Sequence, residues 1–166
     1  MENSVGQLIT IEFTDRKDSI SGFIIEYSEE WILLRNNPVD FIIDGYVILK
    51  NKNIKSFIRS ESEEFTEKVI RLKELQLNSS KKIPLDDLGS ILRFLTDNFG
   101  MFQISTKKEK VAYLGRLIAI NGEELIIDYL EPHAKWGGEL FFNPKKIRVI
   151  EFDTDYINSL KLIADI

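Results

Sequence analysis

Residues 20–34 read ISGFIIEYSEEWILL, and residues 113–127, which lie 93 positions later, read YLGRLIAINGEELII. Each stretch holds a glycine in an apolar run, a short polar turn and a second apolar run. The same shift, without a gap, aligns six identical residues: Gly22 with Gly115, Ile25 with Ile118, Glu30 with Glu123, Gly45 with Gly138, Lys52 with Lys145, and Ile54 with Ile147. We predict one β-rich unit that occurs twice. The alternative is chance, because any two β-meanders share alternating apolar residues and turns.

The first half is expected to hold five strands followed by a helix. Alternating or β-branched apolar runs at 8–13, 20–27, 31–34, 41–43, 46–49 and 54–58 predict the strands. Asp44-Gly45 separates the runs 41–43 and 46–49 and suits a type I′ hairpin turn. Ser60 and Glu63 form a capping box that begins an amphipathic helix over 61–77. Its apolar stripe, which contains Phe65, Val69, Leu72 and Leu75, is expected to pack against the strands.

The second half is expected to begin with a helix over 85–98, which ends near Gly100. Strands are predicted at 101–106, 111–120, 124–130, 139–142 and 147–152. Asn121-Gly122 is the strongest hairpin signal in the chain. Asp153 is expected to cap a final helix that contains Ile157, Leu160 and Ile163.

This pattern resembles the Sm-like and SH3-like small barrels. The second half has the Sm order of a helix and then five strands, and Gly115 stands where that family has the bend glycine of its second strand. The resemblance implies a mainly β (α+β) fold of two tandem five-stranded small barrels, each with a C-terminal helix, and a helix opening the second unit. We place the first barrel at 1–77, a linker at 78–84 and the second barrel at 85–166. The RNA-binding residues of Sm proteins are not kept in 27–31, 50–53, 120–124 or 143–146, so the resemblance does not extend to RNA binding.

Composition excludes several kinds of site. The chain of 166 residues carries a net charge of −5, which disfavours binding to nucleic acid through phosphate contacts alone. It has no cysteine and one histidine, so disulfides and a structural zinc site are excluded. No metal ligand, cofactor site or catalytic residue is predicted. The start of the sequence lacks the features of a signal peptide, and no apolar run reaches the ~18 residues that span a bilayer. A cytoplasmic protein that does not contact membranes is therefore expected.

Two groups of residues in the second half are candidates for binding. One is a loop with an aromatic and basic side chains: Pro132, His133, Lys135 and Trp136. The other is a basic face across neighbouring strands: Lys107, Lys108, Arg116, Lys145, Lys146 and Arg148. The alternative for the first is an ordinary exposed loop, and for the second a solvated surface mixed with acids. Trp31 is expected to be buried, and the sequence does not decide the exposure of Trp136.

The preferred functional hypothesis is a non-catalytic adaptor whose partner is another protein. One specific form of this hypothesis is a bacterial immunity-type protein, because such proteins are compact, acidic and free of motifs. The alternative is binding of RNA or other single-stranded nucleic acid by the second barrel. A third hypothesis, an enzyme that uses His133 with Glu131, has no supporting motif. Neither the partner nor the oligomeric state follows from the sequence.

Overall fold

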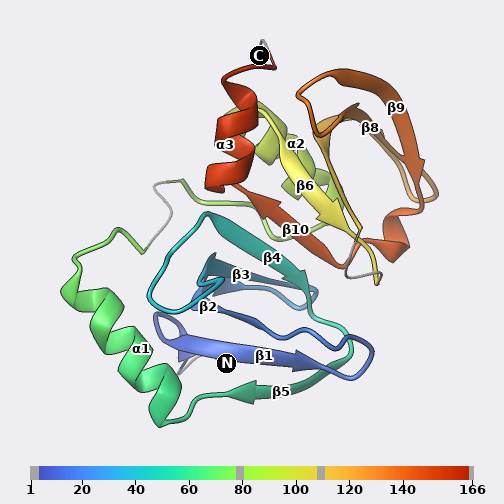
Figure 1. The fold of residues 1–166 in the computed structure, drawn as a ribbon. Helices are drawn as coiled ribbons and strands as arrows, with labels where there is room; N and C mark the ends of the chain where they lie inside the picture. The colour runs from blue at the N-terminus through green and yellow to red at the C-terminus, as the bar shows by residue number, and fades with distance from the viewer. Residues whose placement is uncertain (1–3, 78–80, 108–110, 165–166) are drawn as a thin grey trace. The chain divides into compact units, whose positions relative to one another are not determined.

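The computed structural model describes residues 4–77, 81–107 and 111–164, and it divides into two compact units, Met1–Lys82 and Ile83–Ile166 (Figure 1). Both units are mainly β. The predicted linker begins with residues 78–80, which lie outside the described residues. The side chain of Ile83, at the start of the second unit, is buried.

The first unit is an antiparallel sheet followed by one helix. Its strands pair in the order β5-β1-β2-β3-β4, and α1 lies beside β1. The elements are β1 (Leu8–Phe13), β2 (Ile20–Tyr27), β3 (Trp31–Asn36), β4 (Tyr46–Lys50), β5 (Ile54–Ile58) and α1 (Glu61–Leu72).

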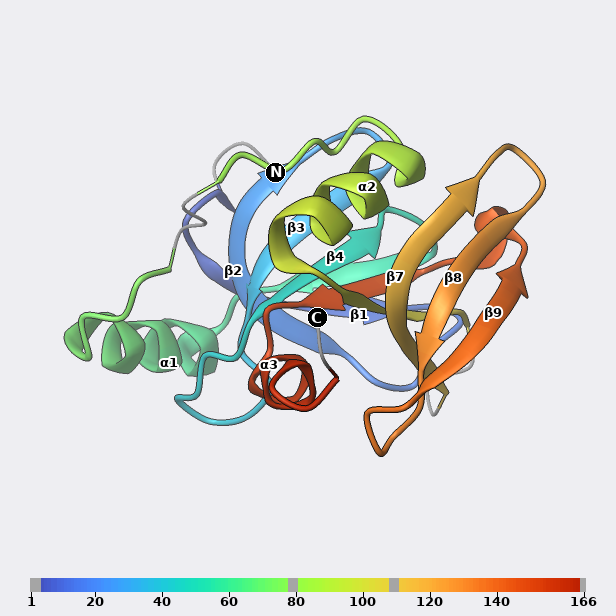
Figure 2. The same cartoon turned by 90° about the horizontal axis from the view of Figure 1, so that it is seen from above.

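The second unit has the same strand arrangement, and an additional helix precedes its first strand in the sequence. Its strands pair in the order β10-β6-β7-β8-β9, and α2 packs on β6 and β7 (Figure 2). The elements are α2 (Leu88–Phe99), β6 (Phe102–Ser105), β7 (Ala112–Ile120), β8 (Leu125–Leu130), β9 (Trp136–Phe142), a 3₁₀ turn (Pro144–Lys146), β10 (Val149–Phe152) and α3 (Asp155–Lys161).

The predicted repeat is confirmed at the level of strand register. Gly22 lies opposite Asn36 in the first sheet, and Gly115 lies opposite Tyr129 in the second, 93 positions later in both strands. The register shifts between Ile24 and Glu26 on β2, and again between Leu117 and Ala119 on β7, at the same offset. The ladders of β1 with β5 and of β6 with β10 also correspond. The two sheets therefore share their pairing as well as their strand order.

The repeated glycines mark a close backbone approach. A Cβ atom added to Gly22 would lie 2.5 Å from the Arg35 carbonyl oxygen, and one added to Gly115 would lie even closer to the equivalent oxygen of Asp128. Any side chain at either position would therefore collide with the neighbouring strand.

The predicted closure into two small barrels is wrong, because each unit is an open antiparallel sheet. Among the described residues, no ladder joins β4 to β5 or β9 to β10, which are the first and last strands in the pairing order within each unit. Bend glycines and bulges require only that the strands curve, and an open sheet curves in the same way. Closure also needs a ladder between the end strands with matching tilt and shear, and no sequence signal specifies that ladder.

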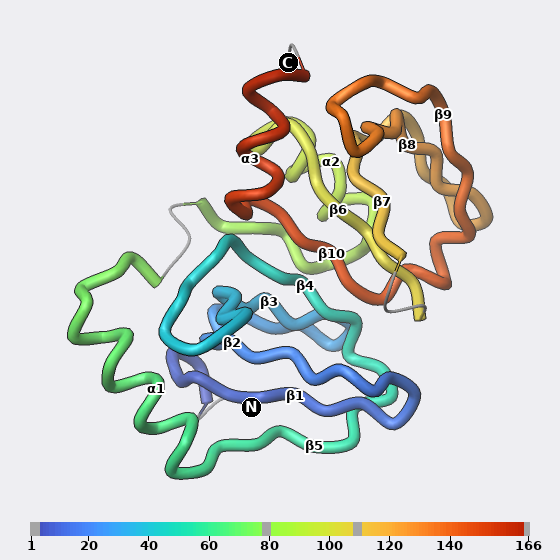
Figure 3. The backbone as a smooth tube through the Cα atoms, in the orientation of Figure 1, coloured from blue at the N-terminus to red at the C-terminus, as the bar shows by residue number. Residues whose placement is uncertain are grey.

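Two expected elements of the first unit differ in the structure. Residues 41–43, expected as part of a strand, lie in the loop 37–45 that joins β3 to β4 (Figure 3). The buried Asn37 amide organises this loop by donating hydrogen bonds to the carbonyl oxygens of Asp40 and Ile42, at 2.9 and 2.7 Å. The helix expected over 61–77 ends at Leu72, and Glu74 has a φ of 54°, which does not continue a helix.

Each unit has its own apolar cluster. In the first unit, Leu8 and Phe23 pack with Ile70 of α1. In the second unit, Met101, Leu114 and Ile157 of α3 belong to one cluster. Trp31, expected to be buried, is 1% exposed. No helix among the described residues is both long and apolar enough to cross a membrane.

Candidate functional site

The predicted loop of the second unit presents three of its four candidate residues to solvent. Pro132, His133 and Lys135 are exposed, whereas Trp136 is half-buried at the start of β9. Trp136 packs against the apolar cluster of its unit, and its indole Nε1 donates a hydrogen bond to the Ala164 carbonyl oxygen at 3.1 Å. The tryptophan thus fastens the segment after α3 to β9, which is a structural role.

The predicted basic face is divided in the structure. Arg148 is buried, at 7% exposure. Arg116 donates to the Asp128 carboxylate at 2.8 Å, and its guanidinium carbon lies 4.2 Å from the centre of the Trp136 ring. The residues of the face that remain exposed among those described are Lys107, Lys145 and Lys146. Lys108 lies outside the described residues. Two of the six basic residues are therefore not free to bind a ligand, because Arg148 is buried and Arg116 is paired with Asp128.

The helix α1 is oriented opposite to the prediction. Phe65 and Leu72, which were expected to pack on the strands, are 61% and 76% exposed. Leu75, just beyond the helix, is 41% exposed. We call Phe65 and Leu72, which lie seven positions apart on one face of the helix, the α1 patch. Val69 is partly buried, and Ile70 is the buried apolar residue that the helix contributes to the core.

A polar side of α1 faces the sheet in place of the apolar stripe. Glu67 accepts a hydrogen bond from the backbone N–H of Leu8 on β1, at 2.9 Å, and Glu63 accepts one from the Thr10 hydroxyl, also at 2.9 Å. Glu63 and Ser60 form the predicted capping box, which is confirmed. The helix is therefore held to β1 by these carboxylates together with the buried Ile70, and Phe65 and Leu72 face outward.

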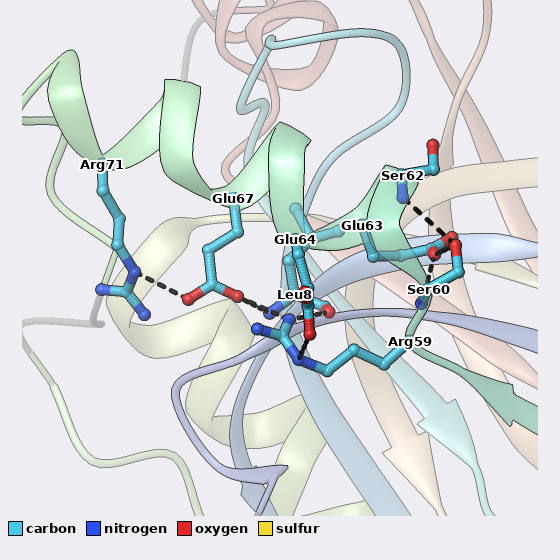
Figure 4. Close-up of polar contacts among 8 residues, drawn as sticks. All are labelled: Leu8, Arg59, Ser60, Ser62, Glu63, Glu64, Glu67 and Arg71. Atoms are coloured by element: carbon cyan, nitrogen blue, oxygen red, sulfur yellow. Dashed lines mark hydrogen bonds and ion pairs between the residues drawn. The ribbon is translucent and has the colours of Figure 1, made fainter.

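Glu67 is the centre of this attachment (Figure 4). Its side chain is 12% exposed and lies between two arginines: Arg59 Nη1 is 2.7 Å from one carboxylate oxygen, and Arg71 Nε is 2.8 Å from the other. Burial alone would raise the pKa of Glu67. The hydrogen bonds from the Leu8 amide, Arg71 and Arg59 outweigh that effect, so the pKa is lowered and the carboxylate is ionised at neutral pH.

The loop 37–45 borders the α1 patch. The ring of Phe41 meets the ring of Phe65 edge to face, with 6.0 Å between the centroids. Lys73 Nζ donates to the Phe41 carbonyl oxygen at 2.8 Å. These two contacts fix the loop beside the helix. The same loop also exposes Val39 and Ile42, which are 52% and 50% exposed.

A surface groove adjoins the patch, and its lining combines Leu72 with charged side chains. The lining residues are Arg59, Glu64, Glu67, Lys68, Arg71 and Leu72.

A second groove lies between α2 and β7. Thr96, on its lining, accepts a hydrogen bond from the Leu117 amide at 3.0 Å and donates to the Leu92 carbonyl oxygen at 2.9 Å. Because these bonds tie α2 to the sheet, that groove is part of the packing.

No family model, curated protein or solved structure matches this chain. The candidate site therefore depends on geometry alone. In the part of the chain that the structure describes, no group of three or more histidine, aspartate or glutamate side chains is placed to hold a metal ion. Among the described residues, the α1 patch combines exposed apolar side chains with an adjoining groove lined by charged ones.

Sequence reasoning missed this surface because it assigned the apolar stripe of α1 to the core. A signal for the opposite orientation was present on the other side of the helix. Glu63, Glu67 and Ile70 also follow helical spacing, and Arg59 and Arg71 lie four to eight positions from Glu67. A carboxylate can hold a helix against a strand when it satisfies a backbone amide there, as Glu67 does for Leu8 beside the buried Ile70.

Proposed function

We propose that this chain is a non-catalytic binding protein that docks another protein on the α1 patch. The observation that supports the proposal is the outward-facing apolar stripe, on which Phe65 and Leu72 remain more than half exposed. Clustered apolar side chains on a surface are typical of protein–protein contacts. Burying one leucine against a partner contributes about 1.5–3 kcal/mol.

The attachment of α1 suits it to this role. The capping box fixes the first turn of the helix, and the Glu67 carboxylate holds the helix to β1 through Leu8 and to the arginines on either side. A surface that is ordered before binding loses less conformational entropy when a partner docks. The α1 patch is therefore a pre-organised contact surface.

The proposal is tested by capture from a lysate of the native cells with tagged protein, in parallel with and without ribonuclease. We expect a defined protein partner to survive ribonuclease and to be lost from the Leu72→Ser variant, with affinity reduced at least about tenfold, which corresponds to about 1.4 kcal/mol. Because Leu72 is 76% exposed, the substitution should change stability by less than about 0.5 kcal/mol.

The matched control is Leu162→Ser. Leu162 is the C-cap residue of α3, the second unit's counterpart of α1, and it is 87% exposed. The control variant should retain the partner. Equal capture by both variants would contradict the proposal. Capture that disappears with ribonuclease and that depends on Lys145 and Lys146 would also contradict the proposal. That result would indicate nucleic-acid binding instead.

A further inference from the structure

We infer that the partner segment that docks on the α1 patch is acidic, with a carboxylate about one helical turn from an apolar side chain. This inference rests on the proposed function and adds the chemistry of the ligand. It is carried by the charges that surround Leu72 and by which of them are already used within the fold.

The groove beside the patch has a cationic excess. Its lining has three basic side chains, two acidic ones and Leu72, although the whole chain has a net charge of −5. Since charged groups at an interface are arranged to complement the partner, this local reversal of sign favours an anionic ligand.

The carboxylates of the groove have little capacity to repel such a ligand. Glu67 already accepts three hydrogen bonds, from the Leu8 amide, Arg59 and Arg71, and its charge is compensated by the two guanidinium groups. Glu64 lies 3.9 Å from Arg59 Nε and is exposed to solvent, where its field is screened.

Lys68 is the cation left available for a ligand. Its side chain is exposed, and it makes no hydrogen bond or ion pair with the rest of the described chain. By contrast, Arg71 is bonded to Glu67 and to the Gly6 carbonyl oxygen, and Lys73 is bonded to the Phe41 carbonyl oxygen.

Lys68 and Leu72 also set the spacing of the ligand. They are four positions apart on α1, so their side chains are neighbours on one face of the helix, with about 5–6 Å between the Cβ atoms. A segment that places a carboxylate at Lys68 and an apolar side chain at Leu72 would satisfy both. We therefore assign Lys68 as the charge anchor and Leu72 as the apolar anchor.

The test is a selection of random 12-residue peptides, displayed on phage, against the full chain. Enriched peptides should carry more Asp and Glu than the starting library, together with Leu, Phe or Trp. A synthetic copy of the most enriched peptide, labelled with fluorescein, then reports affinity by anisotropy. We expect Lys68→Glu and Leu72→Ser each to weaken its binding at least tenfold, and the affinity to fall as salt is raised.

Lys145→Glu is the matched control, because it makes the same change in net charge at an exposed lysine of the second unit. It should leave the affinity within twofold of the original chain. An equal loss in Lys145→Glu and Lys68→Glu would show a general charge effect and overturn the inference.

The remaining outcomes separate this inference from the proposed function. One such outcome is a set of peptides without acidic enrichment, whose binding is weakened by Leu72→Ser but unchanged by Lys68→Glu. That outcome would overturn the inference of an acidic ligand and leave α1 as the docking surface. A selection that yields no Leu72-dependent peptide would also overturn the inference. In that case the capture experiment with Leu72→Ser decides the proposed function independently.

Discussion

Replacement of Gly115 or Gly22 by alanine is expected to lower the free energy of unfolding by about 3 kcal/mol, at the upper end of overpacking effects. An alanine Cβ at Gly22 would lie 2.5 Å from the Arg35 carbonyl oxygen, where van der Waals contact requires more than 3 Å. The obstacle is the backbone of the neighbouring strand, which cannot move without breaking its ladder. The equivalent collision at Gly115 is with Asp128.

Gly122→Ala is the control for this prediction. Gly122 lies in the turn between β7 and β8, and an added Cβ there meets no atom within 4 Å. Its substitution should change stability by less than about 0.5 kcal/mol. Urea denaturation followed by circular dichroism measures all three variants. If Gly115→Ala were as stable as Gly122→Ala, the close strand approach that defines the repeated unit would be refuted.

The variant Glu67→Gln is expected to cost about 2 kcal/mol of stability, because hydrogen bonds to a charged group contribute about 1.5–3 kcal/mol and the amide can replace them only in part. The loss should come with weaker attachment of α1 to β1, visible as faster hydrogen exchange of the Leu8 amide. Glu64→Gln is the control: its side chain is 60% exposed and 3.9 Å from Arg59, so it should cost less than about 0.5 kcal/mol.

The same carboxylate predicts a pH dependence. The pKa of Glu67 is lower in the folded chain than the ordinary value of 4.5, so the unfolded chain takes up the proton first as the pH falls. The stabilisation is therefore complete well above pH 4.5 and is lost as the pH decreases through the folded pKa. The stability difference between the original chain and Glu67→Gln should shrink between pH 6 and pH 3. A difference that stayed constant over this range would contradict the assignment of the charge.

The repeat could be predicted from the sequence because its determinants are local. Gly22 and Gly115 stand at the same offset within apolar runs, and Asn121-Gly122 marks the turn between β7 and β8, where the Asn121 side chain accepts hydrogen bonds from the Glu123 and Glu124 amides. The capping box at Ser60 is likewise read within four residues. Such features depend on residues close in sequence and not on contacts with distant parts of the chain.

The orientation of α1 could not be predicted because its determinant is distant. Glu67 is drawn to the sheet by the Leu8 amide, which lies 59 residues earlier in the chain. Helical spacing shows that Phe65 and Leu72 share a face, but it does not show which face meets the sheet. The same limit explains the wrong expectation of closed barrels, since closure depends on pairing between end strands that no local signal specifies.

The direct test of the docking surface is photo-cross-linking in the native cells, with benzoylphenylalanine incorporated at position 72 and, in a separate variant, at position 162. Both positions are highly exposed leucines at the C-terminal ends of α1 and α3. We expect a discrete cross-linked protein at position 72 and none at position 162. Absence of an adduct at 72, or the same adducts at both positions, would contradict the claim that this chain docks a protein on α1.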